Sequence, residues 1–400
     1  MENNDLSPSG TLPALEWLSL LHRTHDVVEL REALRTRYTA FAPEHLRDLA
    51  ILGAAEEGQR LSQLCRDNGI AVRAVVDDSP ARQGQSIDGV RVQIVDALKS
   101  LPSDTPVVIA SHRVLAASER LHDMGFVNVA PFALLQVLDS VRFPPHMFYD
   151  GWLEDLIGNR NRYAALAHRL ADDFSRRVLD AVVGFRLTFD PAILKPIVEW
   201  DLYGPANLLV YDNDEVYVDA GAYDGDSIRL FIDRVHGNFS RVIAFEPDTN
   251  TFQRLAKNFA DDGRVEPMNA GLHRRTATLR FDNAGTRGSL LVDQGGIEIK
   301  VVGLDEILRG ERVSFVKMNI EGAELEALEG AREAITRWAP KLALSAYHRP
   351  SDLWEVAERV ESLRPDYKLY LRQHDGGVIE TVLYAVPGDT GGAKPTSSNG

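Results

Sequence analysis

The chain has 400 residues and a formal net charge of −15 at pH 7, and Cys65 is its only cysteine. Apolar residues make up 44% and charged residues 26%, which excludes a disordered or collagen-like chain and favours a soluble globular one. The single cysteine excludes an internal disulfide and a cysteine metal cluster, and the negative charge argues against a nucleic-acid partner.

Composition and periodicity divide the chain into five stretches. No apolar run is long enough to span a bilayer, and the acidic, polar start differs from a signal peptide, so we expect a cytoplasmic protein. We expect the following order along the chain: a helical lead-in at 1–45, a small Rossmann-like α/β domain at 46–142, a helical connector at 143–203, a second α/β domain at 204–387 and a disordered tail at 388–400. The predicted fold class is therefore α/β, with two doubly wound domains joined by helices.

The first α/β unit begins with a glycine turn after an apolar strand. We predict strands at 49–52, 71–76 and 107–110. Gly53 and Gly58 match the outer positions of a dinucleotide loop, but Ala55 stands where a second glycine is expected. Asp77 and Asp78 follow the second strand, where an acid can contact a ribose. The unit resembles small Rossmann-like domains that precede sugar-modifying enzymes, and two readings stay open: a bound nucleotide or nucleotide-sugar, or an empty docking domain.

The connector begins after a breaker, Phe143-Pro144-Pro145. Apolar residues then recur at near-helical spacing over 153–183, which predicts one long amphipathic helix or two short ones that pack the domains together. Trp200 and Tyr203 follow in a proline-interrupted segment that could cover a site as a lid or pack against the connector.

A second glycine loop opens the C-terminal unit. Strands are predicted at 216–220, 242–245, 265–269, 315–319, 342–346, 368–371 and 381–386. After the first of these, Gly221 and Gly225 precede a helix that starts near Asp226, and such a loop lets a ligand approach backbone N–H groups. The third small residue of a pyrophosphate loop is missing, whereas Asp219 and Asp224 flank the turn and suit an ammonium or sulfonium ligand.

Glu246 ends the next strand of this unit. An acid at that point can accept both hydroxyls of a ribose, although it could also be a solvated residue at a strand end. Together with the loop, it predicts an adenosine-type cofactor without phosphates, S-adenosylmethionine.

Several ordered motifs of this unit resemble those of the FkbM-type methyltransferases. They lie at 218–227, 245–248, 269–272, 317–324, 345–349 and 380–385. The resemblance covers about 204–387. It implies a class I methyltransferase fold with a seven-stranded, mostly parallel sheet and one reversed strand. It also implies methyl transfer from S-adenosylmethionine to a hydroxyl of a sugar, glycan or secondary metabolite.

The resemblance also implies site residues. Asp219 and Gly221 would line the methionine part, Glu246 would hold the ribose, and Asn319 would lie near the methyl group. The full predicted cofactor site consists of Asp219, Gly221, Tyr223, Asp224, Glu246, Pro247, Asn269, Ala270 and Asn319. The family usually has an aspartate where this chain has Asn319, and an amide keeps an acceptor but removes the charge.

His348 is the leading candidate for the base that takes the acceptor's proton. It follows a strand at the edge where doubly wound sheets bind ligands, and histidine titrates near neutral pH, although a hydrogen-bonded loop histidine is the plainer reading. Glu321 and Asp352 are the alternatives. Together with Asp224 these two acids could offer oxygens to a divalent metal, but their spacing does not demand one, so no metal site is predicted.

Two other functions compete with a methyltransferase that takes a small-molecule or glycan acceptor. A scaffold protein could keep the fold and bind a nucleotide or cofactor with weak catalysis, and Asn319 supports that reading. A nicotinamide-dependent oxidoreductase is disfavoured by the incomplete N-terminal loop. The sequence leaves open a homo-oligomer.

Overall fold

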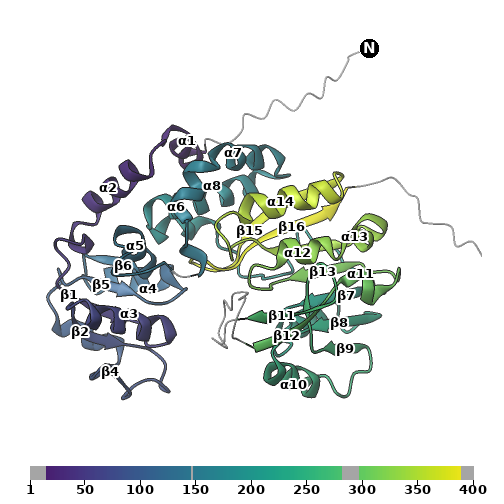
Figure 1. The fold of residues 1–400 in the computed structure, drawn as a ribbon, viewed down its shortest axis with the longest axis horizontal. Helices are drawn as coiled ribbons and strands as arrows, with labels where there is room; N and C mark the ends of the chain where they lie inside the picture. Colours follow the sequence, from purple (N-terminus) through teal and green to yellow (C-terminus); the bar gives the residue numbers. More distant parts are fainter. Residues whose placement is uncertain (1–14, 146, 282–296, 389–400) are drawn as a thin grey trace, which may run out of the picture.

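The computed structural model describes residues 15–145, 147–281 and 297–388, and its two main sheets stand next to each other with helices packed around them (Figure 1). The predicted class of two α/β units is confirmed, while the domain boundaries stay a prediction. The first fourteen residues of the predicted lead-in and residues 389–400 of the predicted tail lie outside the described residues.

The first sheet has six strands and is mainly parallel. Their spatial order is β3 (Ser86–Ile87), β4 (Val90–Gln93), β2 (Ala71–Val76), β1 (Asp48–Leu52), β5 (Val107–Ile109) and β6 (Val129–Pro131). Its helices, together with those that precede it, are α1 (Glu16–Arg23), α2 (Val27–Arg37), α3 (Glu56–Asp67), α4 (Val114–Asp123) and α5 (Phe132–Leu138), with 3₁₀ turns at η1 (Thr39–Phe41) and η2 (Val95–Ser100). The central β1 pairs in parallel with both β2 and β5, as predicted for a Rossmann-like unit.

The second sheet has seven strands. Their spatial order is β15 (Tyr367–Gln373), β16 (Thr381–Pro387), β14 (Lys341–Ser345), β13 (Phe315–Met318), β7 (Val216–Ala220), β8 (Arg241–Phe245) and β9 (Val265–Met268). The helices of this unit are α9 (Asp226–Arg234), α10 (Thr249–Asn258), α11 (Leu304–Leu308), α12 (Glu324–Glu329), α13 (Arg332–Trp338) and α14 (Asp352–Leu363). β16 runs antiparallel to both β14 and β15, which confirms the predicted reversed strand.

Both faces of the second sheet are buried. Successive side chains of a strand point to opposite faces, so each strand contributes residues to both of them. In β7, Val218 belongs to one apolar cluster, whereas Tyr217 belongs to the cluster that also holds Phe231 of α9. The strands therefore read as continuous apolar runs, and helices on both faces leave the carboxyl ends of the parallel strands for a ligand.

A small third sheet was not predicted. It consists of β10 (Gly271–Leu272), β12 (Ile297–Val302) and β11 (Ala277–Phe281), with β11 and β12 antiparallel. Apolar and polar residues alternate along both longer strands. This period of two is typical of half-buried strands and could have predicted them.

The connector differs from the predicted one or two helices. It forms α6 (Trp152–Gly158), α7 (Arg160–Arg169) and α8 (Asp173–Thr188), with 3₁₀ turns at η3 (Met147–Tyr149) and η4 (Pro191–Ile197). α8 begins as a separate helix because Asp172 caps its N-terminus. The Asp172 side chain accepts a hydrogen bond from the Ser175 N–H (2.7 Å). α8 contacts both α1 and β15, so it joins the lead-in to the second sheet.

Candidate functional site

The loop after β7 is held close to the loop after β13. Gly221 has a φ of +76°, and a Cβ built on it would lie 1.9 Å from the carbonyl oxygen of Asn319. Its N–H donates to the Phe245 carbonyl at the end of β8 (3.0 Å). Only glycine fits this position, because both the backbone conformation and the approach of the neighbouring loop exclude a side chain.

Asp219 lies fully buried beneath this loop. Its carboxylate accepts from Lys317 Nζ (2.9 Å), Ser227 Oγ (2.5 Å) and the Tyr217 hydroxyl (3.0 Å). Lys317 also donates to the Gly221 carbonyl (2.8 Å). The geometry therefore makes Asp219 a residue that supports the loop, since its charge is already balanced by a lysine that the sequence did not single out.

Asp224 and Tyr223 form the outer part of the same loop. The Asp224 carboxylate pairs with Arg229 (2.9 Å), so both predicted acids of the loop face a basic side chain. Tyr223 is half exposed with a φ of +49°, and its backbone N–H donates to Glu246 (2.9 Å).

Glu246 is fixed at the end of β8 by two backbone N–H groups. One carboxylate oxygen accepts from Tyr223 N and the other from Asp248 N, both at 2.9 Å. Burial raises the pKa of this carboxyl to about 7, against the lowering effect of those two N–H groups. The Asn269 amide donates to the carbonyls of Glu246 and Pro247 (3.0 Å each), and Ala270 beside it is buried. The ends of β7, β8 and β9 are thus tied together.

Asn319 fits its surroundings as an amide. Its Nδ2 donates to the Tyr203 hydroxyl (2.8 Å), which an ionised aspartate could not do, and its Oδ1 accepts from the Tyr347 hydroxyl (3.3 Å). Tyr203 is buried and donates in turn to Glu380 (3.4 Å). Tyr203 therefore belongs to the hydrogen-bonded group beside β13, and no motif in the sequence indicates that it pairs with Asn319.

The three predicted catalytic residues lie together after β13 and β14. His348 Nδ1 lies 2.9 Å from Glu324 Oε1, and its Nε2 lies 3.7 Å from Glu321 Oε2. Glu324, His348 and Asp352 form a buried triad, in which one ligand-type atom from each residue lies within 4.8 Å of the others. Glu321 is different, because its side chain is 35% exposed and its φ is +55°, a strained conformation for a residue with a side chain.

Charge and burial compete inside the triad. Burial lowers the pKa of His348, but the negative charges of Glu324 and Glu321 outweigh it and raise this pKa to about 9. Burial and the Glu324 charge together raise the pKa of Asp352 to about 7. Burial also acts to raise the pKa of Glu324, but the facing His348 outweighs it and the net shift is downward. The sequence did not single out Glu324, although this residue ends the motif at 317–324 and could have been found there.

The N-terminal unit reaches the same edge of the second sheet. Phe148 of the connector packs against Tyr347 and His348 with ring centroids 5.8 and 6.0 Å away, and it also contacts His112 of the N-terminal unit (5.8 Å). Leu115 N donates to the Gly376 carbonyl (2.8 Å). This edge of the second sheet is therefore bordered by both halves of the chain.

The glycine turn after β1 resembles the one after β7. In both, a glycine has a positive φ, and an acid after the next strand accepts two backbone N–H groups. Gly53 has a φ of +113°, and Asp77 at the end of β2 accepts from Ala54 N (2.7 Å) and Ser79 N (2.8 Å). Asp78 is paired with Arg120 (2.6 Å). A nucleotide or nucleotide-sugar at this turn stays a prediction.

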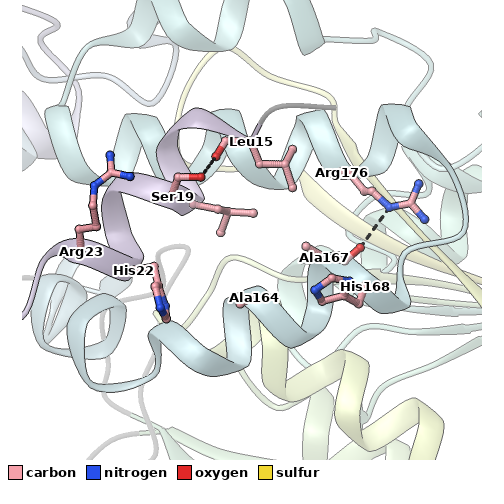
Figure 2. A pocket seen from close by; sticks show the side chains of 9 residues that line it. Leu15, Ser19, His22, Arg23, Ala164, Ala167, His168 and Arg176 are labelled. Carbon is pink, nitrogen blue, oxygen red and sulfur yellow. Dashed lines mark hydrogen bonds between the residues drawn. The ribbon is translucent and has the colours of Figure 1, made fainter. Parts of the chain in front are cut away.

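A cavity of about 340 Å³ lies elsewhere, between α1 and α7 (Figure 2). Leu18, Ala164 and Ala167 give it an apolar wall, and His22 and His168 border it. Among the described residues that line it there is no acid, and Figure 1 places α1 and α7 away from β7 and β8. It shares nothing with the predicted cofactor motifs.

The strand order, the reversed β16 and the loops at the carboxyl edge define a fold of the methyltransferase class. Residues 219–374 match the family described as the Methyltransferase FkbM domain. A crystal structure titled methyltransferase FkbM, from Methylobacillus flagellatus, is 27% identical, covers 92% of this chain and 100% of its own, and has a TM-score of 0.72. Residues 219–374 of the chain thus form an FkbM methyltransferase domain.

A curated relative matches only part of this chain. It is the hexuronic acid methyltransferase AglP of Haloferax volcanii, 30% identical over 131 residues, which are 31% of this chain and 53% of AglP. The chain therefore spans about half the length of that relative. Separately, no helix of the described residues is long and apolar enough to cross a membrane.

Proposed function

We propose that this protein is an S-adenosylmethionine-dependent O-methyltransferase whose acceptor is a hydroxyl of a sugar or sugar-like molecule. One observation carries the proposal. Gly221, Glu246 and Asn269 follow the ends of three neighbouring strands, hydrogen bonds join these ends, and all three residues lie in the stretch that matches the FkbM domain. The name of AglP, which acts on a hexuronic acid, supports a sugar as acceptor.

The residues present fit an adenosine cofactor. Each carboxylate oxygen of Glu246 already accepts one backbone N–H and has a second acceptor site for a ribose hydroxyl. Gly221 leaves its backbone free of a side chain, and Tyr223 offers a half-exposed ring beside it. When bound, the cofactor supplies an electrophilic methyl group on a sulfonium; the chain has to orient the acceptor oxygen and take its proton.

Exposure favours Glu321 as the group that takes that proton. The Glu321 side chain is 35% exposed, whereas that of His348 is 3% exposed and Asp352 is buried. We therefore assign the base to Glu321 and a positioning role to His348, which lies 3.7 Å behind it. A positioned base typically contributes about 10²–10⁴-fold to a rate.

The proposal is tested by titrating the full chain with S-adenosylhomocysteine and by assaying methyl transfer to free and nucleotide-linked uronic acids. We expect Glu321→Gln to lower kcat by roughly 10²-fold or more while the affinity for S-adenosylhomocysteine stays the same. Glu355→Gln, on the same side of the sheet but outside the site, is the matched control. Binding without transfer to any acceptor would favour the scaffold alternative, and an active Glu321→Gln variant would remove the assigned base.

A further inference from the structure

We propose that Glu324, His348 and Asp352 form a binding site for a divalent transition-metal cation, with Zn²⁺ and Mn²⁺ as the ions that the donor set suits. One donor atom from each residue lies within 4.8 Å of the other two, as in the ligand set of a single ion. One imidazole nitrogen and two carboxylates suit these metals better than Mg²⁺ or Ca²⁺, which prefer oxygen donors alone.

The two carboxyl groups of the triad are buried, so their negative charge has to be balanced. Taken as whole residues, Glu324 and Asp352 are each 1% exposed and His348 is 7% exposed, and buried carboxylates are costly unless a positive charge is near. Within the described ranges, no lysine or arginine side chain makes an ion pair with Glu324 or Asp352. The negative charge is then balanced either by protons on the triad itself, at His348 and Asp352, or by a metal ion.

The donor atoms are open toward an ion. Glu324 Oε2 is buried and accepts no hydrogen bond from any described residue. Both ring nitrogens of His348 are also buried, and neither makes a hydrogen bond of normal geometry with a described residue. Such atoms inside a protein are rare unless a ligand satisfies them.

The surrounding groups orient the three donors as they do around bound metals. Glu324 Oε1 accepts from Ile320 N (2.9 Å), and Asp352 Oδ2 accepts from Arg349 N (2.7 Å), so both carboxylates are held by the backbone. Nδ1 of His348 faces Glu324, while Nε2 faces Glu321 at 3.7 Å. A metal-bound histidine usually directs its other ring nitrogen at a carboxylate in this way.

An ion here would connect the turn after β13 to the end of β14. That turn contains Glu321 (φ +55°) and Gly322 (φ +91°), two left-handed residues that need support from their surroundings. The ion would hold the backbone that carries Glu321 and would stay out of contact with the acceptor. The inference does not depend on which acceptor the protein uses.

The test is the metal content of the full-length protein. After incubation with Zn²⁺ or Mn²⁺ and removal of free metal, we expect a single ion per chain by elemental analysis. Glu324→Gln and Asp352→Asn should each lose it, although their amide oxygens can still accept the backbone hydrogen bonds. Glu355→Gln, in the same helix as Asp352, should retain the ion, and circular dichroism shows whether each variant is folded.

A second measurement needs no variant. Pulsed electron paramagnetic resonance of the Mn²⁺-loaded wild type should detect one imidazole nitrogen bound to the metal. Wild-type protein without bound metal would overturn the proposal and leave protons on His348 and Asp352 to balance the charge. Metal retained by both amide variants, or a signal without nitrogen coupling, would also overturn it, because the ion would then lie elsewhere.

Discussion

Glu246 carries a buried carboxyl group whose pKa burial raises to about 7, and we therefore expect cofactor affinity to depend on pH near neutrality. Both of its oxygens face backbone N–H donors, so a protonated carboxyl would have to direct its own hydrogen elsewhere and would lose an acceptor for the ribose. Because the ionised form is the better acceptor, we expect the affinity for S-adenosylhomocysteine to fall as pH drops below 7, by up to about tenfold per unit. Calorimetry at pH 8 and pH 5.5 measures this fall.

The control for that titration is Glu246→Gln, which cannot ionise. We expect this variant to bind about 1.5–3 kcal/mol more weakly at pH 8 and to show no change between the two pH values. An equal pH dependence in the variant and the wild type would assign the effect to another group and remove Glu246 from the ribose contact.

Lys317 is the second residue with a measurable consequence, because it compensates the fully buried Asp219. Lys317→Met would leave that carboxylate buried without a counter-charge, and we expect the free energy of unfolding to fall by about 3–5 kcal/mol. Urea denaturation followed by circular dichroism measures the change. Lys195→Met, which removes an exposed pair with Glu119, should change it little. The double variant Lys317→Met with Asp219→Asn should recover part of the loss, and no recovery would contradict the account.

At the scale of elements, the loops after β7 and β13 meet at Gly221. An alanine there faces two penalties, a φ of +76° and a Cβ 1.9 Å from the Asn319 carbonyl oxygen. Gly237 is a matched control, since its φ is +74° but a Cβ would meet no atom within 4 Å. We expect Gly237→Ala to cost about 1–2 kcal/mol of stability. Gly221→Ala should cost more and should also weaken S-adenosylhomocysteine binding at least about tenfold. Equal effects of the two variants on binding would show that the contact between the loops does not shape the site.

The strands of both main sheets could be predicted because buried parallel strands are continuous apolar runs that local sequence reveals. The predicted strand at 216–220 coincides with β7, and the predicted reversed strand is β16. Pairing between side chains could not be predicted in the same way. Lys317 and Asp219 are 98 residues apart, so nothing local shows that the acid expected to attract a cationic ligand is already neutralised.

The catalytic candidates show the same limit. His348, Glu321 and Asp352 were expected at one edge of the sheet, and they lie there, but their exposure depends on packing that no motif shows. Phe148 from the connector covers His348, and Glu324 faces it from the start of α12. The triad of Glu324, His348 and Asp352 therefore emerges only from the tertiary structure.

At the scale of the molecule, the described parts of both halves share a hydrophobic core. A single buried apolar cluster contains Leu49 of the first sheet, Val183 of α8 and Leu344 of the second sheet. The N-terminal unit also lies close to the loop after β15. A Cβ built on Gly377 of that loop would lie 1.8 Å from the His112 carbonyl oxygen. We therefore expect the wild type to unfold in one cooperative thermal transition.

Gly377→Ala tests whether that contact couples the two halves. The added methyl must separate the segment at His112 from the loop after β15, and we expect the single transition to broaden or split, with the first step at a lower temperature. Gly263→Ala is the control, since a Cβ there meets nothing within 4 Å. Differential scanning calorimetry measures both variants, and each kcal/mol lost should lower a midpoint by about 2–4 °C. If Gly377→Ala unfolds as the wild type does, the close approach of Gly377 to His112 does not couple the two halves, and α8 with the remaining contacts between them does. The aromatic contact of Phe148 with Tyr347 and His348 would then connect the halves without support from the loop after β15.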